Sequence, residues 1–152
     1  MKHLIRTALI VAGATALAAA RPYAAPNPMT IVIGNGPFAG TYSSHAATTM
    51  CLHAKTEQFY SSSFKNLEAK GARALTEGMI KVDTPDKPGA KTGDLHVLFG
   101  SDKKSETRYD VYGVAITMTM KGGDKAELAG AGKTKDGIAI RISASCVDIT
   151  SM

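Results

Sequence analysis

The chain has 152 residues, with 18 lysine and arginine residues against 13 aspartate and glutamate residues, two cysteines and no tryptophan. This length suits one small domain and excludes a multidomain enzyme. The low aromatic content of 6% and the lack of tryptophan weaken the case for stacking on nucleic acid bases or sugars, so we expect no nucleic-acid partner.

The first 20 residues have the pattern of a signal peptide. Lys2 and Arg6 form a basic head, residues 7–20 are uncharged and small or aliphatic, and closing alanines suit a cleavage site. The stretch is shorter than the ~20 apolar residues of a membrane span, so we expect no transmembrane segment. No cysteine lies near the cleavage region, so no lipid anchor is expected. We predict a signal peptide at 1–20 and a periplasmic or secreted protein; a retained N-terminal helix is the alternative.

Residues 21–29 predict a linker, because Pro22, Pro26 and Pro28 lack amide donors and push the residues before them into extended conformations. A single β-rich domain is expected at 30–150, with its first strand at 30–33. Residues 56–70 space their apolar side chains in a way closer to a helix than to a strand, and Gly71 follows as a helix C-cap would.

The second half of the chain alternates apolar residues with smaller or polar ones, at the period of two that is typical of strands. Asp136 and Gly137 supply a hairpin turn before the last strand. We expect alternate residues from Tyr112 to Met120 to face the core, with Met118 and Met120 packing there rather than binding copper. The fold predicted is mainly β: a small antiparallel β-sandwich or partly open β-barrel with a C-terminal three-stranded meander and one short helix. The strands are expected at residues 75–82, 95–99, 112–120, 126–128 and 138–146.

Two cysteines in an exported chain most simply form one disulfide, Cys51 to Cys146, because a free thiol outside the cytoplasm is liable to oxidise. Cys146 lies on the apolar face of the last predicted strand, so the bridge is expected in the core. In the chain-entropy model, a loop of this length contributes about 4.5 kcal/mol. Two buried unpaired cysteines, or an intermolecular pair, are the alternatives.

A candidate metal site lies around the first cysteine, where His45, Met50, Cys51 and His53 are close in sequence. Imidazole and sulfur ligands suit copper or zinc. If this segment is a strand, its odd-numbered residues share a face. The disulfide competes for Cys51, so the metal hypothesis rests on His45 and His53; surface histidines without a metal are the alternative. His96 has no recognisable acid or nucleophile partner in sequence and is expected to point away from the main core.

Catalytic residues are not evident, because no nucleophile, base and orienting group stand in a recognisable frame. Residues 129–134 end like a nucleotide-binding P-loop, but Glu127 stands where that pattern needs its first glycine. We therefore expect a non-enzymatic binding or interaction module of the cell envelope without a cofactor. Its loops 34–40 and 84–93 would present a surface to a small apolar ligand or an envelope component. The alternative is a periplasmic copper- or zinc-binding protein that uses His45 and His53.

Overall fold

The computed structural model describes residues 27–44 and 48–152, and these residues form ten strands and no helix. All ten strands belong to one sheet in the order β10-β3-β4-β5-β6-β7-β8-β9-β1-β2. Every neighbouring pair is antiparallel except β10 with β3. The strands are β1 (Met29–Ile33), β2 (Gly40–Ser43), β3 (Thr48–Ala54), β4 (Phe59–Lys65), β5 (Leu75–Asp83), β6 (Lys91–Phe99), β7 (Thr107–Gly122), β8 (Lys125–Lys133), β9 (Ala139–Cys146) and β10 (Ile149–Ser151).

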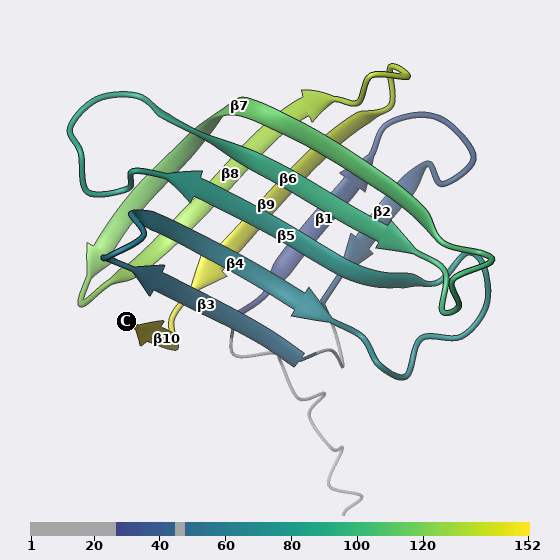
Figure 1. The fold of residues 1–152 in the computed structure, drawn as a ribbon, viewed down its shortest axis with the longest axis horizontal. Helices are drawn as coiled ribbons and strands as arrows, with labels where there is room; N and C mark the ends of the chain where they lie inside the picture. The colour runs from purple at the N-terminus through teal and green to yellow at the C-terminus, as the bar shows by residue number, and fades with distance from the viewer. Residues whose placement is uncertain (1–26, 45–47) are drawn as a thin grey trace, which may run out of the picture.

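The sheet curls into a half-barrel whose two layers face each other (Figure 1). Strands β3 to β6 form one layer, and β8, β9, β1 and β2 form the other. The 16-residue β7 belongs to both, because its first half pairs with β6 and its second half with β8. The short β10 follows β9 and pairs with β3, at the other end of the strand order. The mainly β, partly open barrel or sandwich expected from the sequence is confirmed.

The predicted helix at 56–70 is wrong, because this segment contains strand β4. Tyr60, Ser62 and Phe64 all face the core with exposed fractions of 4% or less. The apolar residues that suggested a helix include Leu67, which is 79% exposed beyond the end of the strand. Pairing with β3 on one side and β5 on the other outweighs the weak local preference of a serine-rich segment.

A bulge in β7 changes which of its residues face the core. Tyr112 and Gly113 together lie opposite Asp94 of β6, and Gly113 takes a φ of 65°. The Gly113 amide donates a hydrogen bond to the Asp94 carboxylate, at 3.0 Å. The expectation that Tyr112 faces the core is therefore wrong: Tyr112 is 63% exposed, and Val111 is buried in its place. Met120, at the rim beside the β7–β8 turn, is 48% exposed rather than buried.

The space between the two layers is filled by apolar side chains and crossed by a disulfide. Cys51 on β3 and Cys146 on β9 are bonded, with Cα atoms 5.8 Å apart, and each is 1% exposed. This confirms the predicted bridge and its place in the core. Such a pair is compatible with an oxidising, extracellular compartment. The core around it includes Ile31, Ile33, Tyr60, Ile80, Leu95, Val97, Phe99, Leu128, Ile140 and Ile142.

The β1–β2 loop, within the segment 34–40 predicted to present a binding surface, packs on one end of the core. Phe38 stacks on Phe99 with ring centroids 4.4 Å apart. The Tyr42 hydroxyl donates a hydrogen bond to the Phe38 carbonyl at 2.8 Å, and the Arg73 guanidinium lies 5.4 Å from the Phe38 ring centroid. Phe38 therefore anchors the loop to the core, whereas residues 34–37 and Ala39 on either side of it are exposed.

Asn27 anchors the beginning of the described chain. It is 2% exposed, and its side-chain oxygen accepts hydrogen bonds from the amides of Val147 and Asp148, at 2.9 and 3.0 Å. The predicted signal peptide at 1–20 and residues 21–26 of the predicted linker 21–29 lie outside the described residues. In the part of the chain that is described, no helix is long and apolar enough to span a membrane.

Removing the bridge should destabilise the fold. We expect Cys51→Ala/Cys146→Ala to lower the free energy of unfolding by about 4 kcal/mol, because the unfolded chain loses a constraint between residues 95 apart. Urea unfolding followed by circular dichroism measures this. Unfolding wild type with a reductant present is the matched control and should reproduce the variant's midpoint. A loss below about 1 kcal/mol would contradict a stabilising role for this bridge.

Candidate functional site

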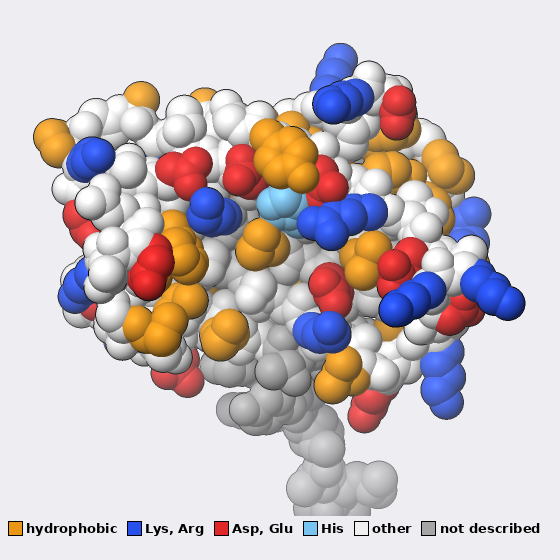
Figure 2. Space-filling view, viewed as in Figure 1, with side chains coloured by type: hydrophobic (Ala, Val, Ile, Leu, Met, Phe, Trp, Pro, Cys, Tyr) orange, Lys and Arg blue, Asp and Glu red, His pale blue; other side chains and the backbone are white. Residues whose placement is uncertain are grey.

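A groove of about 400 Å³ crosses the outer face of strands β3 to β7. Figure 2 shows this face, where hydrophobic side chains lie beside a histidine and several lysine or arginine side chains. Cross-strand pairing sets five side chains in one row, because each pairs with the next on the neighbouring strand. The row runs Met50, Ser63, Met79, His96 and Asp110.

His96 is held at one end of this row by charged partners on β7. Its Nδ1 lies 2.6 Å from Asp110 Oδ1, and the Arg108 Nε lies 2.9 Å from both oxygens of the same carboxylate. Partial burial acts to raise the pKa of Asp110, but hydrogen bonds from His96 and Arg108 outweigh it and hold this pKa below its ordinary value. An ionised Asp110 accepts a hydrogen bond from Nδ1–H, so Nε2 is the nitrogen that carries the lone pair in the neutral imidazole.

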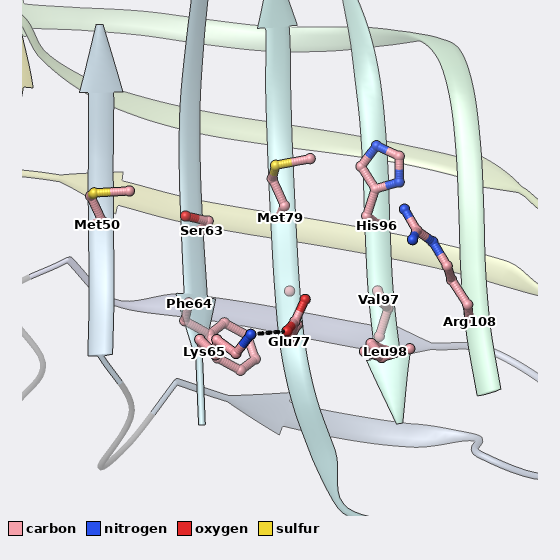
Figure 3. Close-up of a pocket in the computed structure, with 11 residues that line it drawn as sticks. Met50, Ser63, Phe64, Lys65, Glu77, Met79, His96, Val97, Leu98 and Arg108 are labelled. Atoms are coloured by element: carbon pink, nitrogen blue, oxygen red, sulfur yellow. Dashed lines mark ion pairs between the residues drawn. The ribbon is translucent and has the colours of Figure 1, made fainter. Parts of the chain in front are cut away.

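The other side of the groove combines apolar side chains with a second ion pair. Met50 of β3 is 51% exposed, and Met79 of β5 and Leu98 of β6 are half-buried. Lys65 Nζ lies 2.8 Å from Glu77 Oε1 (Figure 3). Lys65–Glu77 and Arg108–Asp110 are therefore two ion pairs, and within each pair the positive and negative charges balance. The surface of the groove between these pairs is largely apolar.

His96 and Asp110 form a histidine–carboxylate pair, but the hydroxyl in their row is too far away to act with them. Ser63 is two strands from His96, with Met79 between them. At a strand spacing of nearly 5 Å, this separation is about 10 Å, well beyond hydrogen-bond reach. Ser63 and the His96–Asp110 pair therefore do not form a nucleophile–base arrangement.

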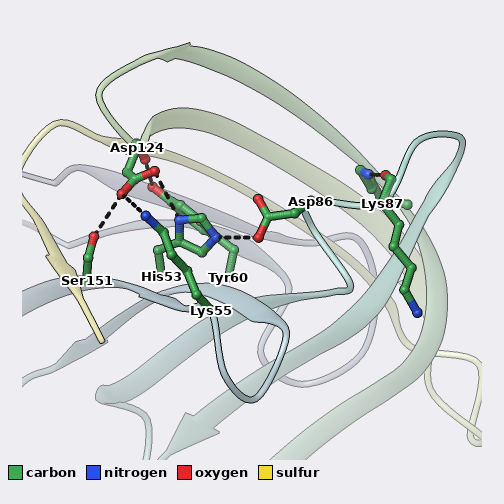
Figure 4. A network of polar contacts seen from close by, with 8 residues as sticks. His53, Lys55, Tyr60, Asp86, Lys87, Asp124 and Ser151 are labelled. Carbon is green, nitrogen blue, oxygen red and sulfur yellow. Dashed lines mark hydrogen bonds and ion pairs between the residues drawn. The ribbon is translucent and has the colours of Figure 1, made fainter.

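A second polar cluster lies at one end of the barrel, around His53 of β3. This side chain is 2% exposed, and each of its ring nitrogens faces a carboxylate (Figure 4). Nε2 forms a 3.0 Å hydrogen bond with Asp86 of the β5–β6 loop. Nδ1 lies 3.2 Å from Asp124 of the β7–β8 turn, an ion-pair distance without the geometry of a hydrogen bond. Asp86 belongs to the predicted binding loop 84–93, whose last three residues are part of β6.

Asp124 connects this cluster to the C-terminal strand. Its carboxylate accepts a hydrogen bond from the Ser151 hydroxyl at 2.9 Å and lies 3.2 Å from Lys55 Nζ. These contacts, with a smaller one from His53, hold the pKa of Asp124 below its ordinary value. The Tyr60 hydroxyl donates to the Asp124 carbonyl at 2.8 Å, and burial, with the nearby Asp124 charge, raises the pKa of Tyr60 to about 12. The cluster thus joins β3, β4, the β7–β8 turn and β10.

The predicted metal ligands are only partly described. His45 lies outside the described residues, whereas Cys51 and His53 share the buried face of β3 as expected. Cys51 is committed to the disulfide, and Met50 lies on the opposite, outer face. Within residues 27–44 and 48–152, no three His, Cys, Asp or Glu side chains are grouped so as to hold a metal ion. Metal binding through His45 and His53 stays a prediction.

Sequence reasoning placed His96 outside the core correctly but did not identify its partners. Asp110 and Arg108 become neighbours of His96 only through the β6–β7 register. The strand alternation around residues 95–99 and 107–111, combined with a hairpin between them, is the signal that would have found the pair. The carboxylates beside His53 come from two separate turns, for which the sequence holds no comparable signal.

Comparisons with protein-family models, with curated proteins and with solved structures find no match for this chain.

The buried Tyr60 hydroxyl predicts an alkaline loss of stability. Because the pKa of Tyr60 is about 12 in the folded state against 10.0 ordinarily, the native state keeps a proton that the unfolded state releases. This contribution is complete below pH 10 and is lost as the pH rises towards 12. Tyr60→Phe should flatten the fall in stability over this range, and at pH 7 it should cost about 1 kcal/mol for the lost hydrogen bond.

Urea midpoints measured from pH 7 to 12 test this prediction. Tyr112→Phe removes an exposed hydroxyl and is the matched control. An equally steep alkaline loss in wild type and in Tyr60→Phe would show that another group causes it.

Proposed function

We propose that this chain is an exported, non-enzymatic binding module whose outer groove holds a small, uncharged and largely apolar molecule. The observation that carries the proposal is the groove itself, which exposes apolar side chains between two internally balanced ion pairs. Its volume of about 400 Å³ falls within the range typical of small-molecule sites. Because its walls are strands rather than loops, the site is preorganised.

The packed interior supports a surface site over an internal one. Side chains from both layers, including Ile80, Leu95 and Ile142, are fully buried against each other in the space between the layers. A carrier that encloses its ligand needs an apolar cavity at this position. The groove, by contrast, needs no rearrangement of the core before it can be filled.

The charge balance of the groove supports an uncharged ligand. Arg108 is engaged by both oxygens of Asp110, and Lys65 is engaged by Glu77. A charged ligand would have to displace one partner of these pairs to gain a counter-ion of its own. An apolar ligand instead contacts flexible methionine and leucine side chains, which adapt to irregular shapes.

The alternative function, copper or zinc binding through His45 and His53, rests on the sequence pattern alone. The two carboxylates beside His53 compete with a metal for its ring nitrogens.

Titration with Nile red, an uncharged apolar dye whose fluorescence rises in apolar surroundings, tests the binding proposal. Wild type should bind the dye saturably, and Leu98→Asn should weaken binding about tenfold, because it places a polar amide in the groove without adding charge. Leu67→Asn makes the same change at a residue that is 79% exposed and is not among those lining the groove, so binding should be unchanged. Loss of saturable binding in wild type, or equal affinities for both variants, would refute the proposal.

A further inference from the structure

We propose that Met79 and His96 form a binding site for a soft monovalent metal ion, Cu(I), at the edge of the groove. The two residues are direct partners across β5 and β6. Side chains of such partners begin about 5 Å apart and project from the same face. Figure 3 shows the Met79 side chain extending towards the His96 ring. A thioether and an imidazole are therefore brought together by the sheet register itself.

The partners of His96 prepare its other nitrogen for a metal. The His96 Nδ1–H donates a hydrogen bond to Asp110, so in the neutral imidazole Nε2 carries the lone pair that a metal ion needs. Arg108 Nε also holds the Asp110 carboxylate, with 2.9 Å contacts to both of its oxygens. A carboxylate behind a histidine is the usual support of a metal-binding imidazole, where it orients the ring and raises its basicity. His53 differs in this respect, because both of its nitrogens face carboxylates.

The donor set selects the metal. A thioether sulfur is a soft, neutral ligand that favours Cu(I), whereas zinc sites are built from cysteine, histidine and carboxylate ligands. The Tyr112 ring packs edge-on against the His96 ring, with the two ring centroids 5.4 Å apart, and covers one side of the imidazole. The thioether donor therefore points to Cu(I) as the ion.

This site is distinct from the metal site predicted at His45 and His53, and it does not rest on the apolar-ligand proposal. Nile red binding is measured on metal-free wild type, and Cu(I) binding is measured on wild type without dye. Failure of one measurement therefore leaves the other proposal standing.

Anaerobic titration of the mature chain with Cu(I), in competition with the chromophoric chelator bicinchoninate, tests the site. We expect one Cu(I) per chain. Met79→Leu, which conserves volume, and His96→Gln should each weaken binding at least tenfold. Asp110→Asn should weaken it by 10- to 100-fold through the loss of imidazole support. Met120→Leu removes another exposed thioether, outside the groove, and should leave the affinity unchanged.

X-ray absorption of the Cu(I) complex gives a second measurement that is independent of affinity. We expect sulfur scattering in wild type and its loss in Met79→Leu, a variant whose folding circular dichroism verifies. Wild type that binds no Cu(I), or Met79→Leu with the affinity and sulfur signal of wild type, would overturn the proposal. Binding lost in His53→Gln but retained in His96→Gln would also overturn it and would assign the metal to the predicted His45 and His53 site.

Discussion

Closure of the curled sheet at β3 is the constraint on which the rest of the structure depends. β3 and β9 lie far apart in the strand order, yet a disulfide joins them and β10 pairs with β3 directly afterwards. Because the Cys51 side chain must point inward to reach Cys146, the alternation of β3 sends Met50 outward and His53 inward. The bridge therefore determines which residues of β3 face the groove and which join the buried cluster at the barrel end.

The same alternation separates two roles across strands β4 to β6. One set of positions supplies the packed core, and the positions between them supply the groove. Residues of the outer row, such as Met79 and His96, are therefore held in place by the burial of their chain neighbours Ile80 and Val97. This is why a surface site on this fold can be as well defined as one on the inside. Met50 and Met79 lie on this outer face, so they do not pack in the core between the two layers.

The sequence predicted the strands in which apolar and polar residues alternate regularly. The predictions were wrong where pairing with strands distant in sequence determines the local structure. The run from Ile140 to Cys146 shows its buried face directly in the alternation of its residues. The disulfide was predicted from two cysteines in a chain expected to be exported. The segment 56–70 was misread because β4 is stabilised by two neighbouring strands rather than by its own preference. Tyr112 was placed on the wrong face, because a bulge set by Asp94 and Gly113 shifts the alternation. The partners of His96 and His53 were missed for a related reason: hydrogen bonds between side chains on different strands and turns depend on register.

Sulfur appears in two chemical forms in this chain, and the fold keeps them apart. The thiols of Cys51 and Cys146 are consumed by a buried covalent bond, which is compatible with an oxidising compartment. Thioethers form no such bonds, so Met79 on the outer face keeps its lone pairs available under the same conditions. With both cysteines in the disulfide, the soft-metal site proposed on this chain depends on methionine rather than on cysteine. The imidazole that would complete this site is that of His96, and Asp110 already forms a hydrogen bond with its Nδ1.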